Sequence, residues 1–194
     1  MVGVILVESG FKSGNRSTRW QELSFAIVGL GLIGGSYAKA LRKLGVKQII
    51  GIERDAKTLA AAKAQGLVDV ALTAADASLR QANVIICAIY PEALLGFIGA
   101  NVQFFNPDVL LTDVAGIKND MIARCQAFLK PGMEFISGHP MAGRQGSGLG
   151  MNISVNLIGN LLLIRQEKIT PKLRVNIRHA CAITKASGHK VASF

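Results

Sequence analysis

Ser24-Phe25-Ala26-Ile27-Val28-Gly29-Leu30-Gly31-Leu32-Ile33-Gly34 is the stretch that decides the fold of this 194-residue chain. Its first five residues are apolar enough to predict a short buried strand. The next six match G-x-G-x-x-G, and the helix predicted over 33–44 follows at once. A lone glycine motif is weak evidence, but a motif between a strand and a helix is typical of dinucleotide binding.

The rest of the chain continues to alternate between strands and helices. Strands are predicted over 24–28, 48–52, 67–72, 83–89, 108–112, 133–137, 161–164 and 191–194. Helices are predicted over 33–44, 56–65, 76–81, 118–129 and 171–186, with one more starting at Pro91. This alternation predicts an α/β fold, a Rossmann-type doubly wound and mostly parallel sheet with helices on both faces. We expect a flexible extension over 1–23 and one NAD(P)-binding domain over 24–194.

Composition limits the classes of protein that fit. Half of the residues are hydrophobic and the mean hydropathy is +0.37, as expected for buried parallel strands. The longest apolar run, 84–90, is far shorter than the roughly 20 residues of a membrane helix. No basic segment precedes the apolar residues 2–7, so we expect no signal peptide. The cysteines, Cys87, Cys125 and Cys181, lack metal-site spacing, which favours a cytoplasmic protein without a metal.

The net charge of +10 is concentrated near the end of the chain. From Gly159 onward there are seven lysines and arginines against one acidic residue, Glu167. Nucleic-acid binding is one interpretation of such a segment. The charges lack interleaved aromatic residues, so a solvated helix face or a contact with an acidic partner segment is favoured. We expect neither a nucleic-acid nor a membrane partner.

Each glycine of the motif has a specific task. Gly29 allows the tight turn, Gly31 lets the backbone approach the pyrophosphate, and Gly34 lets helix and strand pack closely. Glu53 follows Gly34 by 19 residues, at the end of the second strand, where an acidic side chain binds ribose hydroxyls. A carboxylate there repels a 2′-phosphate, which favours NAD over NADP, although the adjacent Arg54 could accommodate that phosphate. The expected cofactor-binding residues are Gly29, Leu30, Gly31, Leu32, Ile33, Gly34, Glu53 and Arg54.

A histidine lies in a glycine- and proline-rich segment, Gly138-His139-Pro140-Met141-Ala142-Gly143. It follows the strand predicted over 133–137, and ligands of open α/β sheets bind beyond the carboxyl ends of strands. Neutral imidazole accepts a proton near neutral pH, so His139 is a candidate general base. The alternative is a surface histidine without a catalytic role.

Three segments together resemble the prephenate/arogenate dehydrogenase family. They are residues 29–36, the segment Thr112-Asp113-Val114-Ala115-Gly116-Ile117-Lys118, and Gly138–Gly143 followed by Ser147-Gly148. The resemblance covers about 24–194, the nucleotide domain of these enzymes, which make tyrosine precursors. It implies oxidative decarboxylation, in which His139 takes the proton of the substrate's C4 hydroxyl, the nicotinamide takes the hydride and carbon dioxide leaves. It also implies a homodimer formed through a further helical domain that follows this region in the family.

The chain departs from the family pattern at two positions. Gly116 stands where many members have a serine that orients the histidine and the substrate, and Gln145 stands where many have a glutamate. The arginine that holds the substrate carboxylate lies in the family's helical domain and has no counterpart here. We therefore take Asp113, Lys118 and Arg144 as candidate substrate-binding residues.

Two other functions stay open. The chain could be a dinucleotide-binding module with little or no turnover on its own, or a different Rossmann dehydrogenase that acts on a small hydroxy acid. The sequence does not distinguish prephenate from arogenate.

Overall fold

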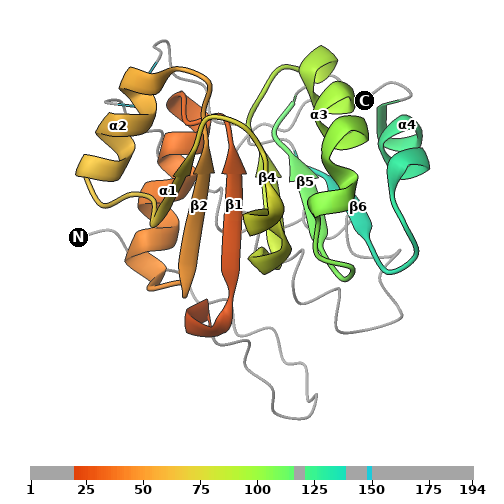
Figure 1. The fold of residues 1–194 in the computed structure, drawn as a ribbon, viewed down its shortest axis with the longest axis horizontal. Coiled ribbons are helices and arrows are strands. Elements are labelled where there is room, and N and C mark those ends of the chain that lie inside the picture. The colour runs from red at the N-terminus through yellow and green to blue at the C-terminus, as the bar shows by residue number, and fades with distance from the viewer. Residues whose placement is uncertain (1–19, 116–120, 139–147, 150–194) are drawn as a thin grey trace, which may run out of the picture.

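Six strands form one parallel sheet in the order β3-β2-β1-β4-β5-β6 (Figure 1). The computed structural model describes residues 20–115, 121–138 and 148–149. Adjacent strands pair in register, for example Ala26 with Ile50 and with Ile85. The predicted α/β, doubly wound parallel fold is confirmed. The strands are β1 (Ser24–Val28), β2 (Gln48–Ile52), β3 (Val70–Leu72), β4 (Val84–Cys87), β5 (Leu110–Asp113) and β6 (Glu134–Ser137).

Helices cover both faces of this sheet. The helices α1 (Leu32–Leu44) and α2 (Ala56–Ala64) pack on one face, together with Phe25 and Ile27 of β1. The helices α3 (Pro91–Asn101) and α4 (Met121–Phe128) pack on the other, together with Ala26 and Val28. Because both faces are covered, all five residues of β1 are buried, which explains its unbroken apolar sequence. Short 3₁₀ helices occur at Trp20–Glu22, Ala77–Gln81 and Val102–Phe104.

Several element boundaries differ from the sequence-based expectation. β1 and β2 have the predicted bounds. β3 is shorter because Leu67 and Val68 are buried against the core as part of the preceding turn. β4 ends at Cys87, and β5 extends one residue further than predicted, to Asp113. The elements predicted over 161–164, 171–186 and 191–194 lie outside the described residues.

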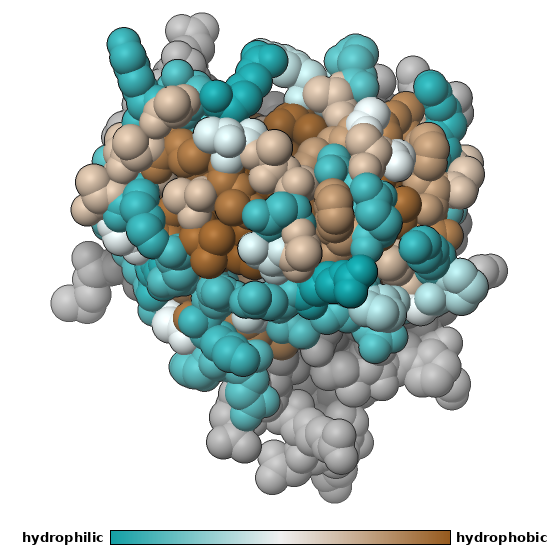
Figure 2. All heavy atoms as spheres, in the orientation of Figure 1, coloured by the Kyte–Doolittle hydropathy of each residue, from teal (hydrophilic) through white to brown (hydrophobic). Residues whose placement is uncertain are grey.

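α3 is the most apolar helix of the described region. Its sequence runs PEALLGFIGAN, with Leu94 and Ile98 buried and Leu95 and Phe97 half-buried. Figure 2 shows the face of the molecule that is in view in Figure 1, with hydrophobic residues over its middle and hydrophilic residues along its lower rim. Within the described part of the chain, no helix has the length and apolar character needed to cross a membrane.

The strand order reverses between β1 and β4, and this switch point is where open α/β sheets have their ligand-binding crevice. From β1 the chain passes through α1 to β2 on one side, whereas from β4 it passes through α3 to β5 on the other. The two connections therefore separate at the carboxyl ends of these neighbouring strands (Figure 1). In open α/β sheets, ligands bind at this point.

Two glycines bring α1 against the end of β1. A Cβ added to Gly34 would lie 1.8 Å from the carbonyl oxygen of Gly29. Gly29 itself has φ +86°, and a Cβ there would lie 2.5 Å from the carbonyl oxygen of Ala88. Both obstacles are backbone atoms, so no side-chain rotation could relieve the overlap.

Substitution of Gly34 by alanine should disrupt this packing. We expect Gly34→Ala to destabilise the fold by more than 1 kcal/mol, because overpacking between fixed groups typically costs about 1–3 kcal/mol. Gly96→Ala in α3 is the matched control, since no atom lies within 4 Å of its added Cβ. Alanine favours an exposed helix by up to about 1 kcal/mol over glycine, so this variant should be at least as stable as the parent. Urea unfolding measures both, and equal stability of the two variants would contradict the packing argument.

Candidate dinucleotide-binding site

The glycine loop presents the uncapped amino end of α1 at the crevice. The N–H of Gly29 donates to the carbonyl oxygen of Ile52 at 2.8 Å, which fastens the loop to β2. α1 begins after Gly31 without a side-chain cap, and its first turn holds no acidic residue. Free N–H groups and the positive end of the helix dipole at such a terminus attract phosphate.

The space beside Gly31 fits an incoming phosphate. A Cβ added to Gly31 would meet no atom within 4 Å, whereas the same test at Gly29 and Gly34 gives severe overlaps. The two outer glycines are thus required for packing, and the central one faces open space.

Glu53 links the end of β2 to the glycine loop. Its Oε2 accepts a hydrogen bond from the N–H of Leu30 at 2.8 Å, and its Oε1 accepts one from the N–H of Asp55 at 3.0 Å. Each carboxylate oxygen has a second lone pair, so both can still accept a hydrogen bond from a ribose hydroxyl. Arg54 is exposed beside it. The structure therefore brings Glu53 to the motif, as the spacing predicted.

Asp113 is buried at the end of β5, only 2% exposed, and its carboxylate joins two loops. Its Oδ1 accepts hydrogen bonds from the hydroxyl of Ser137 at 2.7 Å and from the N–H of Gly138 at 3.2 Å. Its Oδ2 accepts one from the N–H of Ala115 at 3.0 Å. A buried carboxylate is costly unless donors surround it, and here they come from the starts of the loops after β5 and β6.

The Asp113 carboxylate contributes to the raised pKa values of two buried neighbours, Tyr37 and Cys87. Burial raises the pKa of Tyr37 well above its usual value, and the nearby Asp113 carboxylate adds to the effect. Burial likewise raises the pKa of the Cys87 thiol, with further contributions from Asp113 and Cys125. Cys87 and Cys125 are fully buried and not joined in a disulfide, so they are core residues rather than accessible nucleophiles. In the described part of the chain, no group of three or more histidine, cysteine and acidic residues could hold a metal ion.

The described residues on either side of 139–147 contact the rest of the domain. Before it, Gly138 lies so close to β5 that an added Cβ would be 2.8 Å from the carbonyl oxygen of Asp113. After it, the carbonyl oxygen of Leu149 accepts a hydrogen bond from the Lys39 ammonium group at 2.8 Å. The Leu149 side chain is buried against α1, where a Cβ on Gly35 would approach it to 2.6 Å. Gly138 therefore lies at the carboxyl edge of the sheet, and Leu149 lies against α1.

Several residues singled out from the sequence lie outside the described residues. They are His139, Lys118, Arg144, Gly116 and Gln145. Conversely, the sequence analysis missed Ser137 as a partner of Asp113 and Leu149 as a partner of Lys39. No local signal marks these pairs, because their members lie 24 and 110 residues apart in the chain.

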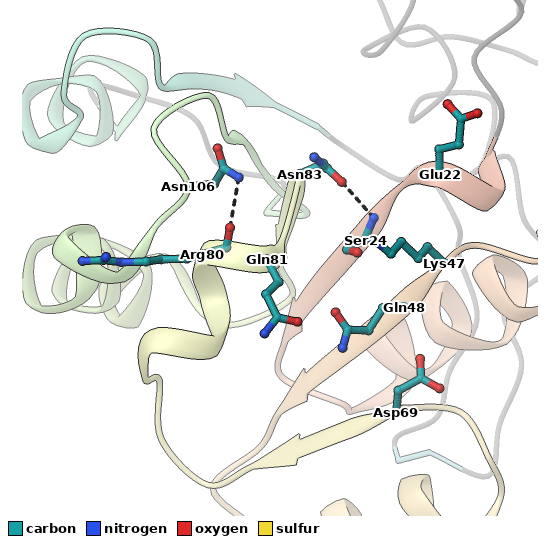
Figure 3. Close-up of a pocket in the computed structure, with 9 residues that line it drawn as sticks. All are labelled: Glu22, Ser24, Lys47, Gln48, Asp69, Arg80, Gln81, Asn83 and Asn106. Atoms are coloured by element: carbon teal, nitrogen blue, oxygen red, sulfur yellow. Dashed lines mark hydrogen bonds between the residues drawn. The ribbon is translucent and has the colours of Figure 1, made fainter.

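A polar cavity of about 590 Å³ lies at the opposite, amino edge of the sheet (Figure 3). Two of its polar side chains already stabilise the backbone. The Oδ1 of Asn83 accepts a hydrogen bond from the N–H of Ser24 at 2.9 Å, and the Nδ2 of Asn106 donates to the carbonyl oxygen of Arg80 at 3.0 Å. This cavity is remote from the glycine loop, because it adjoins the first residues of β1 and β2. Its lining residues are Glu22, Ser24, Lys47, Gln48, Asp69, Arg80, Gln81, Asn83 and Asn106.

Comparison with known proteins identifies relatives of this domain. The prephenate dehydrogenase of Bacillus subtilis (strain 168) is 32% identical over 125 residues, which cover 63% of this chain and 34% of that protein. The crystal structure of Synechocystis arogenate dehydrogenase is 31% identical with a TM-score of 0.59, over 66% of this chain and 44% of that one. The chain thus spans about a third of the length of the Bacillus relative.

A third similarity concerns the fold alone. The crystal structure of prephenate dehydrogenase from Aquifex aeolicus, in complex with hydroxyphenyl propionate and NAD⁺, superimposes with a TM-score of 0.62 at 21% identity. The match covers 86% of this chain and 68% of that one.

The family model that matches describes the nucleotide-binding domain of prephenate dehydrogenase, and the match extends over residues 37–191. The match includes Asp113 and most of α1, and it begins at residue 37, three residues after the last glycine of the loop. The chain belongs to the prephenate dehydrogenase family, of which it contains the nucleotide-binding domain.

Proposed function

We propose that this domain serves the NAD-dependent oxidative decarboxylation of prephenate or arogenate, a step of tyrosine biosynthesis. The observation that carries the proposal is the juxtaposition at the carboxyl edge of the sheet. There the uncapped amino end of α1 and the anchored Gly138 lie at the same edge of one parallel sheet, and Leu149, which follows the histidine segment in the chain, packs against Gly35 of α1. An enzyme that oxidises a hydroxyl group needs a hydride acceptor and a proton acceptor near one another. The family membership makes an oxidoreductase the expected class of enzyme.

The residues of the glycine loop fit a dinucleotide, and NAD is the one we propose. The N–H groups of Leu32, Ile33 and Gly34 would hold the pyrophosphate, and the Glu53 carboxylate would accept the ribose hydroxyls. The bound nicotinamide supplies a hydride acceptor. Because Glu53 carries a negative charge beside the ribose, a 2′-phosphate would be repelled. The Aquifex enzyme, which shares the fold, was crystallised with NAD⁺.

His139 is our candidate for the proton acceptor. In its neutral form the imidazole would take the proton of the substrate's C4 hydroxyl as the C4 hydrogen leaves as hydride. Loss of the ring carboxylate as carbon dioxide then makes the ring aromatic, which supplies much of the driving force. Lys118 and Arg144 are candidates for holding the substrate carboxylates, and the homodimer implied by the family resemblance belongs to the same proposal.

Asp113 would act through His139 rather than on the substrate. It is almost fully buried, and both of its oxygens accept hydrogen bonds from protein donors. One of these donors is the N–H of Gly138, the residue directly before His139. We therefore propose that Asp113 is a positioning residue that fixes the backbone from which the histidine segment departs.

The matching family model describes a nucleotide-binding domain, so dinucleotide binding with little or no turnover on its own is the second candidate function. The assays below separate the two functions.

Removal of the charge of Glu53 should change the preference between NAD and NADP. Glu53→Gln keeps an oxygen that can accept the Leu30 N–H but no longer repels a 2′-phosphate. We expect the parent chain to bind NADH at least tenfold more tightly than NADPH, and the variant to narrow this ratio several-fold; tenfold corresponds to about 1.4 kcal/mol. Titrations of coenzyme fluorescence measure both constants. A parent chain that prefers NADPH would contradict the assignment.

His139→Asn should abolish turnover and leave coenzyme binding intact. Loss of a general base typically lowers kcat by about 10²–10⁴-fold, whereas the coenzyme constant should change less than twofold. The measurement is NADH formation from NAD⁺ with prephenate and, separately, with arogenate. Full activity of the variant would refute the role of His139. A parent chain that binds NADH but forms none from either substrate would support the binding-module function instead.

Asp113→Asn should destabilise the domain more than Ser137→Ala does. The asparagine replaces one carboxylate oxygen by an NH₂ group, which then faces one donor (Ala115) or two (Ser137 and Gly138), and such a mismatch at a buried site costs about 1–3 kcal/mol. Ser137→Ala removes one donor and leaves Gly138 and Ala115 on the carboxylate, for a loss of about 1 kcal/mol. Urea unfolding gives both values. If Asp113→Asn were as stable as the parent, the Asp113 carboxylate would not be what joins the loops after β5 and β6.

A further inference from the structure

The loop between β4 and α3 forms the second wall of the crevice. The N–H of Ala88 donates to the carbonyl oxygen of Val28 at 2.7 Å, which holds the loop against the end of β1. A Cβ added to Gly29 would lie 2.5 Å from the carbonyl oxygen of Ala88 and 2.9 Å from the Cγ2 of Ile89. The residues that follow β4 therefore lie directly against the glycine loop.

Tyr90, the next residue of this loop, carries an uncovered aromatic ring. Its side chain is 81% exposed, and among the described residues only Phe128 is also a large hydrophobic residue with an exposed side chain. The backbone of Tyr90 is fixed, because its carbonyl oxygen accepts hydrogen bonds from the N–H groups of Ala93 and Leu94 at 3.0 and 3.1 Å. Pro91 begins α3 directly after it. An exposed ring is thus attached to a fixed backbone, at the residue directly after Ile89, which lies against Gly29.

The position of Tyr90 determines which half of a dinucleotide it would meet. The amino end of α1 takes the pyrophosphate, and Glu53, on the β2 side, takes the ribose of the adenosine half. The other half must then extend across the crevice, from β1 toward β4. The group that reaches the β4–α3 loop is the nicotinamide riboside. Flat rings and sugars pack well against an aromatic side chain, which loses little entropy when it is covered.

We propose that the ring of Tyr90 packs against the nicotinamide riboside half of the bound dinucleotide. The proposal rests on the proposed cofactor site and adds to it a contact on the β4 side. Tyr90 then contributes to affinity for the whole dinucleotide and contributes nothing to affinity for its adenosine half. This difference separates the proposal from a general effect on the fold.

The test compares two ligands and three variants. NADH binding is followed by its fluorescence, and ADP binding by competition with NADH. Tyr90→Ala should weaken NADH binding about tenfold and leave the ADP constant within twofold. Tyr90→Phe keeps the ring and should bind both ligands like the parent. Phe128→Ala removes the other exposed aromatic residue, which lies on α4 beside Gly99, and should also bind both like the parent.

The outcomes distinguish this proposal from the cofactor site on which it rests. If Tyr90→Ala weakens neither ligand, or weakens both equally, the contact with the nicotinamide half is refuted and the cofactor site stands. If the parent chain binds neither NADH nor ADP, the cofactor site and the role of Tyr90 both fail. Unfolding midpoints within 2 °C of the parent for all three variants ensure that folded proteins are compared.

Discussion

The contact between Gly34 and the backbone of Gly29 sets the distance between α1 and the sheet. With no Cβ at position 34, the helix approaches the end of β1 until backbone meets backbone. This approach determines where the free N–H groups of the first helical turn lie, and therefore where a phosphate can bind. It also brings the β4–α3 loop within reach, since Ala88 and Ile89 lie against Gly29. The crevice is consequently a result of backbone packing more than of any polar side chain.

Two carboxylates, the half-buried Glu53 and the buried Asp113, perform a related task elsewhere at the same edge. Glu53 connects β2 to the glycine loop, and Asp113 connects β5 to the start of the segment after β6. In each case the acidic residue accepts a backbone N–H from a different loop, so the loops are fixed relative to one another. The residues at the ends of β2 and β5, Glu53 and Asp113, thus hold the loops that a dinucleotide and a substrate would touch. This arrangement suits a reaction that needs a hydride acceptor and a base at a fixed separation.

Local patterns predicted the first half of the fold more accurately than the contacts at the site. The bounds of β1 and β2 followed from short apolar runs bordered by glycine and charged residues, and Glu53 was placed by its spacing from Gly34. The Asp113–Ser137 contact could not be predicted, because it depends on the register between β5 and β6, in which Asp113 lies opposite Ser137. Tyr90 ended an apolar run in the sequence, but hydrogen bonding with β1 and β5 stops before it, and the structure leaves its ring in solvent. Where residues far apart in the sequence meet, only the assembled sheet reveals the contact.

A crystal structure of this chain with NAD⁺ tests the central claim most directly. The account predicts the pyrophosphate beside Gly31, within hydrogen-bond distance of the first N–H groups of α1, and a ribose hydroxyl on the Glu53 carboxylate. A dinucleotide found elsewhere, for example in the polar cavity at the amino edge of the sheet, would contradict it.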